Sequence, residues 1–129
     1  MSNATRAPED RYETHLDVPF GPLELVDLEP VIDGVEHPWF NQTLCRVNES
    51  VVRLGAVSGE YHWHQHQDDD EFFYVVSGRL LIDLADGTID LRPGQAVVIP
   101  KGTPHRPRAP EPTVMLMVET AGIVPTGDA

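Results

Sequence analysis

The sequence predicts an all-β protein, a barrel or jelly roll built from short strands. Short apolar runs recur along the chain, and clusters of glycine, proline, asparagine or aspartate separate them. No stretch shows the apolar period of an amphipathic helix. The 129 residues suit one domain, which is long enough to bury roughly two thirds of the surface that its unfolded chain exposes.

The expected barrel covers residues 16–121, between a loosely ordered N-terminus at residues 1–15 and a loose tail at residues 122–129. Leucines within residues 23–28 indicate a short edge segment. Prolines near both ends of residues 31–35 limit that stretch to a brief turn or strand. The expected strands are residues 41–47, 50–57, 61–66, 72–76, 79–84, 88–91, 95–99 and 113–119.

Turn signals connect these strands. Asn48-Glu49 joins the first two, and Asp86-Gly87 is the strongest hairpin signal, because a type I′ turn needs positive φ at both central positions. Arg92-Pro93-Gly94 has the chemistry of a type II turn, and Pro100-Lys101-Gly102 turns the chain again. The proline-rich residues 107–112 predict a loop.

Net charge and cysteine content narrow the partners and the compartment. A net charge of −12 and a pI near 4.6 argue against a nucleic-acid partner, because phosphate neutralisation needs a basic surface. No apolar run approaches a membrane span. One cysteine, Cys45, excludes an internal disulfide, and no secretory leader is apparent, so we expect a cytoplasmic protein.

The histidines His62, His64 and His66 alternate along one of the expected strands, which places the three imidazoles on one face. A turn at residues 67–70 would bring Glu71 back beside them. A divalent transition metal is typically coordinated by imidazole nitrogens and carboxylate oxygens, each about 2.0–2.2 Å from the ion. Because such groups are costly to bury without partners, this stretch predicts a metal site.

Two spaced motifs are visible in the middle of the chain. The first consists of His64, His66, Glu71 and Gly78, and the second of Gly94, Pro100, Gly102 and His105. Together they resemble the paired motifs of the cupin family, and at finer grain the chain is similar to small bacterial cupins of the mannose-6-phosphate isomerase-like group. The leading glycine of the first motif falls on Ser58, and the terminal asparagine of the second falls on Ala109. Neither departure touches a ligand.

The resemblance implies a cupin double-stranded β-helix, a jelly-roll barrel, around one divalent transition metal. Its ligands carry over to His64, His66, Glu71 and His105. The donor set permits Fe, Mn, Ni, Co or Zn. A name from the isomerase-like group transfers the fold better than the reaction.

Three further side chains are candidates for the site. His62 is a candidate catalytic acid or base. Three alternatives stay open: it could hydrogen-bond to a ligand, replace one of the ligands, or simply fill the barrel mouth. Strand parity turns Phe73 and Val75 inward with Glu71, as an apolar wall of the substrate pocket. By the same parity, Tyr61 and Trp63 are expected to point away from the site.

The expected function is a metal-dependent enzyme, an isomerase, lyase or dioxygenase acting on a small oxygenated substrate such as a sugar or hydroxy-carbonyl compound. The alternative is a binding or sensing protein whose metal holds a small ligand without turnover. Cupins of this size resemble one another in dimerising, so we also expect a homodimer, with residues 23–35 available for the contact.

Overall fold

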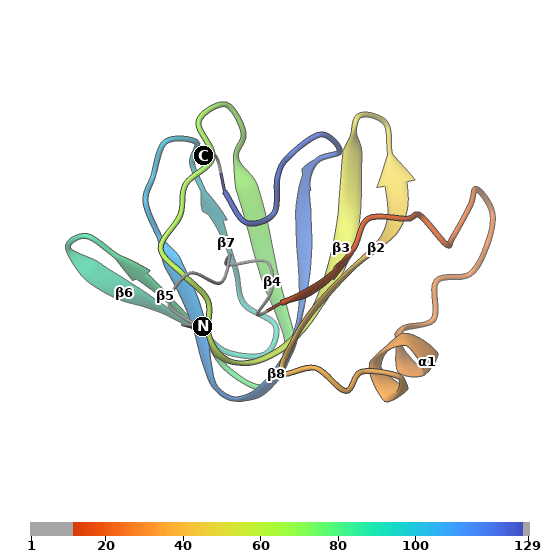
Figure 1. Cartoon of the computed structure of the whole chain (residues 1–129), viewed down its shortest axis with the longest axis horizontal. Coiled ribbons are helices and arrows are strands. Elements are labelled where there is room, and N and C mark those ends of the chain that lie inside the picture. Colours follow the sequence, from red (N-terminus) through yellow and green to blue (C-terminus); the bar gives the residue numbers. More distant parts are fainter. Residues whose placement is uncertain (1–11, 128–129) are drawn as a thin grey trace, which may run out of the picture.

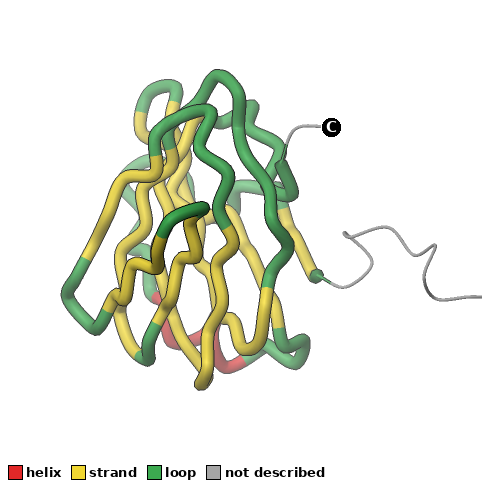
Figure 2. The backbone as a smooth tube through the Cα atoms, turned by 90° about the vertical axis from the view of Figure 1, so that its left-hand side faces the viewer, coloured by secondary structure: helices red, strands yellow, loops and turns green. Residues whose placement is uncertain are grey.

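The computed structural model describes residues 12–127 and confirms the all-β class. One short helix, α1 (Leu28–Asp33), accompanies eight strands. The strands are β1 (Glu13–His15), β2 (Trp39–Val47), β3 (Ser50–Glu60), β4 (Glu71–Ser77), β5 (Leu80–Leu84), β6 (Gly87–Leu91), β7 (Ala96–Ile99) and β8 (Arg106–Thr120). They curl around a common interior (Figures 1 and 2), in agreement with the expected double-stranded β-helix.

The long strand β8 lies at the centre of the sheet. The strand order is β1-β2-β3-β8-β4-β7, and β5 pairs with both β6 and β8. All described pairings are antiparallel except that of β1 with β2. One strand therefore joins the two sides of the barrel seen in Figure 1.

In β2, β3 and β8, alternate residues face two different cores. The inward set of β8, which includes Met115 and Met117, joins an inner cluster with Phe73, Val75 and Ile82. The outward residues join a second cluster around Phe40, Leu44 and Leu54. The inner cluster is the barrel interior, where the candidate site lies.

Helix α1 was not expected from the sequence. It packs against the outer cluster and covers the outer face of the sheet (Figure 1). Asp27 caps it by accepting a hydrogen bond from Glu29 N, and Pro30 lies in its first turn, where a missing N–H costs little. The six-residue helix is too short to show an apolar period, which explains why the prediction of a turn or strand at residues 31–35 is wrong.

The predicted loop at residues 107–112 is also wrong, because β8 runs through it. Pro107 keeps a role in the ladder, since its carbonyl oxygen accepts from Tyr61 N. Pro110 and Pro112 lie where the β3–β8 register shifts, so their missing N–H groups interrupt little pairing. At the start of β8, Asp83 of the paired strand β5 accepts hydrogen bonds from Arg106 and Arg108.

Residues 61–66 do not form the expected strand. Gly59 has a φ of 95° at a register shift, and beyond Glu60 the chain keeps a single bridge, between His64 and His105. The turns at Gly94 and Gly102 have the positive φ that their predictions require. The hairpin turn precedes Gly87, which begins β6, so its predicted position is off by one residue.

The ends of the chain lie close to the barrel where they are described. Most of the N-terminal stretch predicted as loosely ordered falls outside the described residues, but Glu13–His15 form β1. In the predicted loose tail, Ile123 is 6% exposed. No helix among residues 12–127 has the length and apolar character needed to span a membrane.

Candidate metal centre

Three potential ligands from two chain segments meet inside the barrel. His64 and His66 come from the segment after β3, and Glu71 begins β4. Their ligand atoms all lie within 4.8 Å of one another. His66 and Glu71 are buried, at 3% and 4% exposure, so this group is not a solvated surface cluster.

His105 joins the group across the isolated bridge. Its backbone N–H donates to His64 O at 2.9 Å, and His64 N–H donates to His105 O at 3.0 Å. The two rings lie with centroids 4.3 Å apart, and His105 Nε2 is 3.3 Å from Glu71 Oε1. His105 therefore lies beside His64 and Glu71, whereas the group whose ligand atoms all lie within 4.8 Å of one another consists of His64, His66 and Glu71.

Backbone carbonyls fix the tautomers of two of these histidines. His64 Nδ1 is 3.1 Å from His62 O, and His105 Nδ1 is 2.8 Å from Thr103 O. A carbonyl oxygen can only accept, so Nδ1 carries the hydrogen in both rings. With the hydrogen on Nδ1, Nε2 is the ring nitrogen available to a metal, as in metal-bound histidines.

The remaining distances fit one cation. Glu71 Oε1 lies 3.3 Å from His105 Nε2 and 3.5 Å from His66 Nε2, and neither ring nitrogen of His66 has a hydrogen-bond partner. Ligand atoms about 2.1 Å from one ion stand roughly 3.0–3.4 Å apart. The buried, unpartnered imidazole and the facing acceptor atoms thus fit a divalent metal.

Burial sets the charge of these groups. Burial, followed by the nearby His105, lowers the pKa of His64 to about 4, so its ring is neutral at pH 7. Burial alone would raise the pKa of Glu71, but its close contacts with His105, then with His66 and Glu119, outweigh burial and hold that pKa well below its usual range. A neutral imidazole and an ionised carboxylate are the forms that bind a metal.

A second buried carboxylate, Glu119, lies behind Glu71. Burial, and then the charge of the neighbouring Glu71, raise the pKa of Glu119 to about 9. Arg53 opposes this, with Nε 2.9 Å from Glu119 Oε2, although the two atoms are not aligned for a hydrogen bond. Arg53 also donates to Thr43 Oγ1 at 2.7 Å.

Strand parity could have revealed Glu119 and Arg53. Glu119 follows Met115 and Met117 at alternate positions of β8, and Arg53 holds the same inward phase in β3. The two motifs nominate only one carboxylate, Glu71. The interior therefore holds more ionisable groups than expected.

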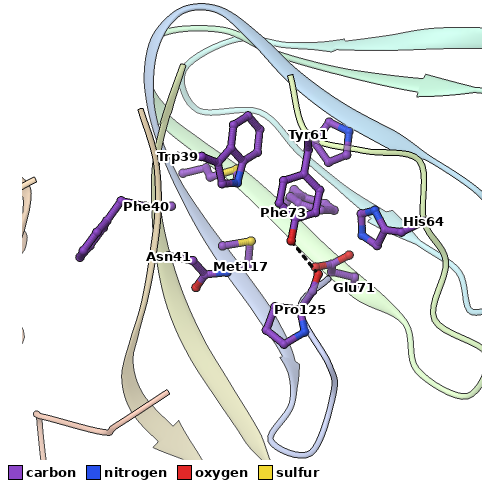
Figure 3. A pocket seen from close by; sticks show the side chains of 12 residues that line it. Trp39, Phe40, Asn41, Tyr61, His64, Glu71, Phe73, Met117 and Pro125 are labelled. Carbon is purple, nitrogen blue, oxygen red and sulfur yellow. Dashed lines mark hydrogen bonds between the residues drawn. The ribbon is translucent and has the colours of Figure 1, made fainter. Parts of the chain in front are cut away.

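A small cavity opens beside the ligands (Figure 3). Phe73 lines it, as expected, whereas Val75 lies in the inner core and outside the lining. Asn41 is 8% exposed, lines the same cavity, and its Oδ1 has no hydrogen-bond partner. Figure 3 shows Asn41 across the space from His64 and Glu71.

The two aromatic neighbours of His62 behave differently from one another. Trp63 is 48% exposed and points outward, as expected, whereas Tyr61 is 8% exposed and lines the cavity, so its expected outward direction is wrong. The irregular backbone after Gly59 explains the change, because strand parity does not continue through it.

Both ring nitrogens of His62 have partners in the structure. Nε2 donates to Thr126 O at 2.7 Å, and Nδ1 accepts from Tyr12 Oη at 3.0 Å. Its ring is 5.3 Å from that of His64. The acid or base role of His62 stays a prediction, and it would require these bonds to break.

Comparison with known proteins gives consistent likenesses. Residues 49–119 match the family described as Cupin domain. The chain is 41% identical over 97 residues to the uncharacterized protein YdbB of Bacillus subtilis. The match covers 74% of this chain and 86% of that protein. It resembles the crystal structure of a cupin-2 domain containing protein from Shewanella frigidimarina with a TM-score of 0.71 and 32% identity, over 74% of this chain and 94% of that one.

The chain is also similar in part to a protein that is named as an enzyme. Over 79 residues the chain is 32% identical to 3-hydroxyanthranilate 3,4-dioxygenase 2 of Aspergillus fumigatus. The match covers 57% of this chain and 38% of that enzyme.

Proposed function

This chain belongs to the cupin family, and from that premise we propose that it is a metal-dependent enzyme acting on a small oxygenated substrate. The reaction is of the isomerase, lyase or dioxygenase type. One divalent transition metal, Fe, Mn, Ni, Co or Zn, would be held by His64, His66, Glu71 and His105. Bound there, it would act as a Lewis acid toward a carbonyl or hydroxyl oxygen, or bring a chelated substrate and dioxygen together.

The observation that carries the proposal is the state of the ligand atoms. His66 offers two buried nitrogens without partners, and Glu71 Oε1 faces Nε2 of both His66 and His105. Leaving a buried polar group unpaired costs about 1–3 kcal/mol, so a structural role alone explains this arrangement poorly. Three imidazoles and one carboxylate also leave one or two positions of an octahedral ion to a ligand.

The cavity lining favours a neutral, largely apolar substrate. Its walls are mainly aromatic, methionine and proline side chains, and the Oδ1 atom of Asn41 has no hydrogen-bond partner. Its carboxamide can hydrogen-bond a hydroxyl, amino or carbonyl group at the end of the substrate remote from the metal. No lysine or arginine lines this cavity among the described residues, so a phosphate or sulfate group would lack a counter-charge.

During the reaction, the protein side chains would orient the substrate and exclude water from it. Tyr61 and Phe73 exclude water from one side, and Asn41 fixes the far end. His62 is the proposed acid or base, although it has to leave Thr126 and Tyr12 to act.

The alternative is metal-anchored binding without turnover. One observation favours it: in the described structure, both nitrogens of His62 are engaged, and the titratable groups lining the cavity are His64, Glu71 and Tyr61. A sensing protein needs no further acid or base.

The experiment begins with elemental analysis of untagged protein. Oxygen consumption and isomerisation of hydroxy-carbonyl compounds are then measured with Fe(II)-loaded and Mn(II)-loaded protein, using His66→Ala as the control. Turnover that disappears in the variant supports an enzyme. Tight binding of catechol with no turnover favours the binding protein, and failure to retain any divalent metal contradicts both.

We further propose a homodimer in the cytoplasm. Leu23 is fully exposed with a φ of 67°, and Leu25 is 85% exposed, so the edge segment offers an apolar contact to a second copy. Light scattering should give twice the monomer mass, and Leu23→Lys with Leu25→Lys should restore the monomer. A monomeric wild type contradicts the proposal.

A further inference from the structure

The C-terminal segment, residues 123–127, folds over the mouth of the barrel (Figure 1). Its carbonyl oxygens accept two side-chain hydrogen bonds from the chain beside the candidate ligands. Tyr61 Oη donates to Pro125 O at 3.2 Å (Figure 3), and His62 Nε2 donates to Thr126 O at 2.7 Å. The segment is thus tied to the stretch that carries His64.

The last described residue lies directly against a candidate ligand. Gly127 has a φ of +98°, and a Cβ added there would lie 2.6 Å from His64 Cβ. A side chain at this position would meet both backbone strain and a steric clash. Only glycine fits so close to His64, so this end of the segment covers one side of the metal group.

With the segment in this position, the cavity is small. Its free volume is about 20 Å³, counted as space for the centre of a water-sized sphere, which is room for roughly one or two water molecules. Nine of the twelve lining residues belong to β2, β3, β4 or β8. Tyr61 and His64 are fixed by backbone hydrogen bonds to β8 and to the bridge. Pro125 is the remaining lining residue.

We propose that residues 123–127 are the specificity-determining wall of this site, and that Tyr61 and His62 hold the wall closed. When the segment is closed, only ligands of two or three atoms can reach the metal group. A larger substrate enters when the segment lifts and its two side-chain hydrogen bonds break. While the segment is closed, His62 is a positioning residue with both nitrogens engaged, and only when the segment lifts is Nε2 released for the acid or base role proposed above.

The inference rests on the proposed function only for the identity of what enters. The closure itself is a property of the metal-free chain, because every contact described above joins protein atoms. The two ideas can therefore fail separately.

The first test uses metal-free protein and diethyl pyrocarbonate, with modification of each histidine followed by mass spectrometry. The variants are Gly127→Val, Tyr61→Phe and His62→Phe. Gly122→Val is the matched control, because a Cβ at Gly122 meets no atom within 4 Å. His15, whose side chain is 42% exposed, is the internal reference.

We expect slow modification of His64 in the wild type and in Gly122→Val. Losing one hydrogen bond should raise the open population, and with it the modification rate of His64, about fivefold in Tyr61→Phe and His62→Phe. Gly127→Val should raise it further. The rate at His15 should not change. Equal rates at His64 in wild type and Gly127→Val, or a wild-type rate at His64 equal to that at His15, would overturn the inference.

The second test uses Co(II)-loaded protein and two probes of different size, azide and catechol, followed by the visible spectrum of the metal. The wild type should bind azide rapidly, and its catechol binding should level off at a rate set by opening of the segment. Gly127→Val should remove that limit. Catechol binding as fast as azide binding in the wild type would contradict the inference, whereas failure to bind Co(II) would contradict only the proposed function.

Discussion

Glu71 Oε1 lies 3.3 Å from His105 Nε2, and both atoms are acceptors when the His105 ring is neutral, because its Nδ1 donates to Thr103 O. Two acceptors at this distance are stable when a cation, either a metal ion or a proton, lies between them. His66 Nε2 lies 3.5 Å from the same oxygen atom of Glu71.

Removal of metal should lower the unfolding temperature. A ligand that binds only the folded state stabilises it by about 2.7 kcal/mol at a concentration of 100 Kd, which corresponds to roughly 10 °C for a domain of this size. Calorimetry of Zn(II)-loaded, Mn(II)-loaded and chelator-treated protein measures the shift. Identical unfolding temperatures in all three would argue against a metal site.

His66→Leu should have opposite effects with and without metal. It removes a ligand, so metal binding should weaken by at least about tenfold. It also removes two buried nitrogens that have no partner, so the metal-free variant should be as stable as the metal-free wild type or more stable, by up to about 1–3 kcal/mol. Urea unfolding of both apoproteins checks this. A strongly destabilised apo variant would show that His66 has an unseen structural role.

Arg53→Met should destabilise the protein by about 1–3 kcal/mol, because it removes the guanidinium beside the buried Glu119 and the hydrogen bond donated to Thr43. The double variant Arg53→Met with Glu119→Leu should recover much of this loss, since both buried polar groups are then absent. A double-mutant cycle by urea unfolding gives the coupling free energy. Strict additivity would mean that the two side chains do not act as a pair.

Asn41→Leu should separate ligand binding from folding. The substitution removes a buried oxygen that has no partner, so the free energy of unfolding should stay equal or rise. Affinity for catechol on the Co(II)-loaded protein should fall about tenfold, the value of one hydrogen bond of roughly 1.4 kcal/mol. Titration calorimetry measures both metal and catechol. Unchanged catechol affinity would remove Asn41 from the site.

Asp83 should make stability depend on acid pH. Hydrogen bonds from Arg108, then from Arg106 and Thr88, outweigh partial burial and hold its pKa well below the ordinary 3.8. A lowered pKa gives stability that is present above the unfolded value near 3.8 and is lost as the pH falls through the folded value.

Asp83→Asn should therefore lower the free energy of unfolding at pH 7 by about 1 kcal/mol, after allowing for solvent screening. The difference from wild type should shrink below about pH 4. Urea unfolding between pH 3 and pH 7 measures it. A difference that stays constant over this range would be inconsistent with the shifted carboxyl group.

The sequence predicted the fold class and the group around His64 well, because local patterns determine both. Strand alternation and glycine turns are short-range signals. His64, His66 and Glu71 are also close in the sequence, and a single turn brings them together. It missed features set by long-range packing. Tyr61 turned inward because the backbone after Gly59 is irregular, and α1 formed on an apolar surface that other strands supply.

The contrast between local and long-range signals also explains why the sequence did not predict the position of the C-terminal segment or the pair Arg53 and Glu119. Residues 122–129 look like a short loose tail in the sequence, and only the position of Tyr61 and His62 shows what the segment rests on. Glu119 was visible in principle, since it continues the inward alternation of Met115 and Met117. Its partner Arg53 lies in another strand, and no local pattern connects the two.

The central place of β8 has a consequence for the order in which the protein is made. Its partners β3, β4 and β5 all leave the ribosome earlier, so each waits with one edge unpaired until residue 120 emerges. Assembly of the barrel then depends on contacts between distant parts of the chain, which are slow to form. Nascent chains stalled before β8 should thus be the aggregation-prone species of this protein, and chaperones should act on them at that stage.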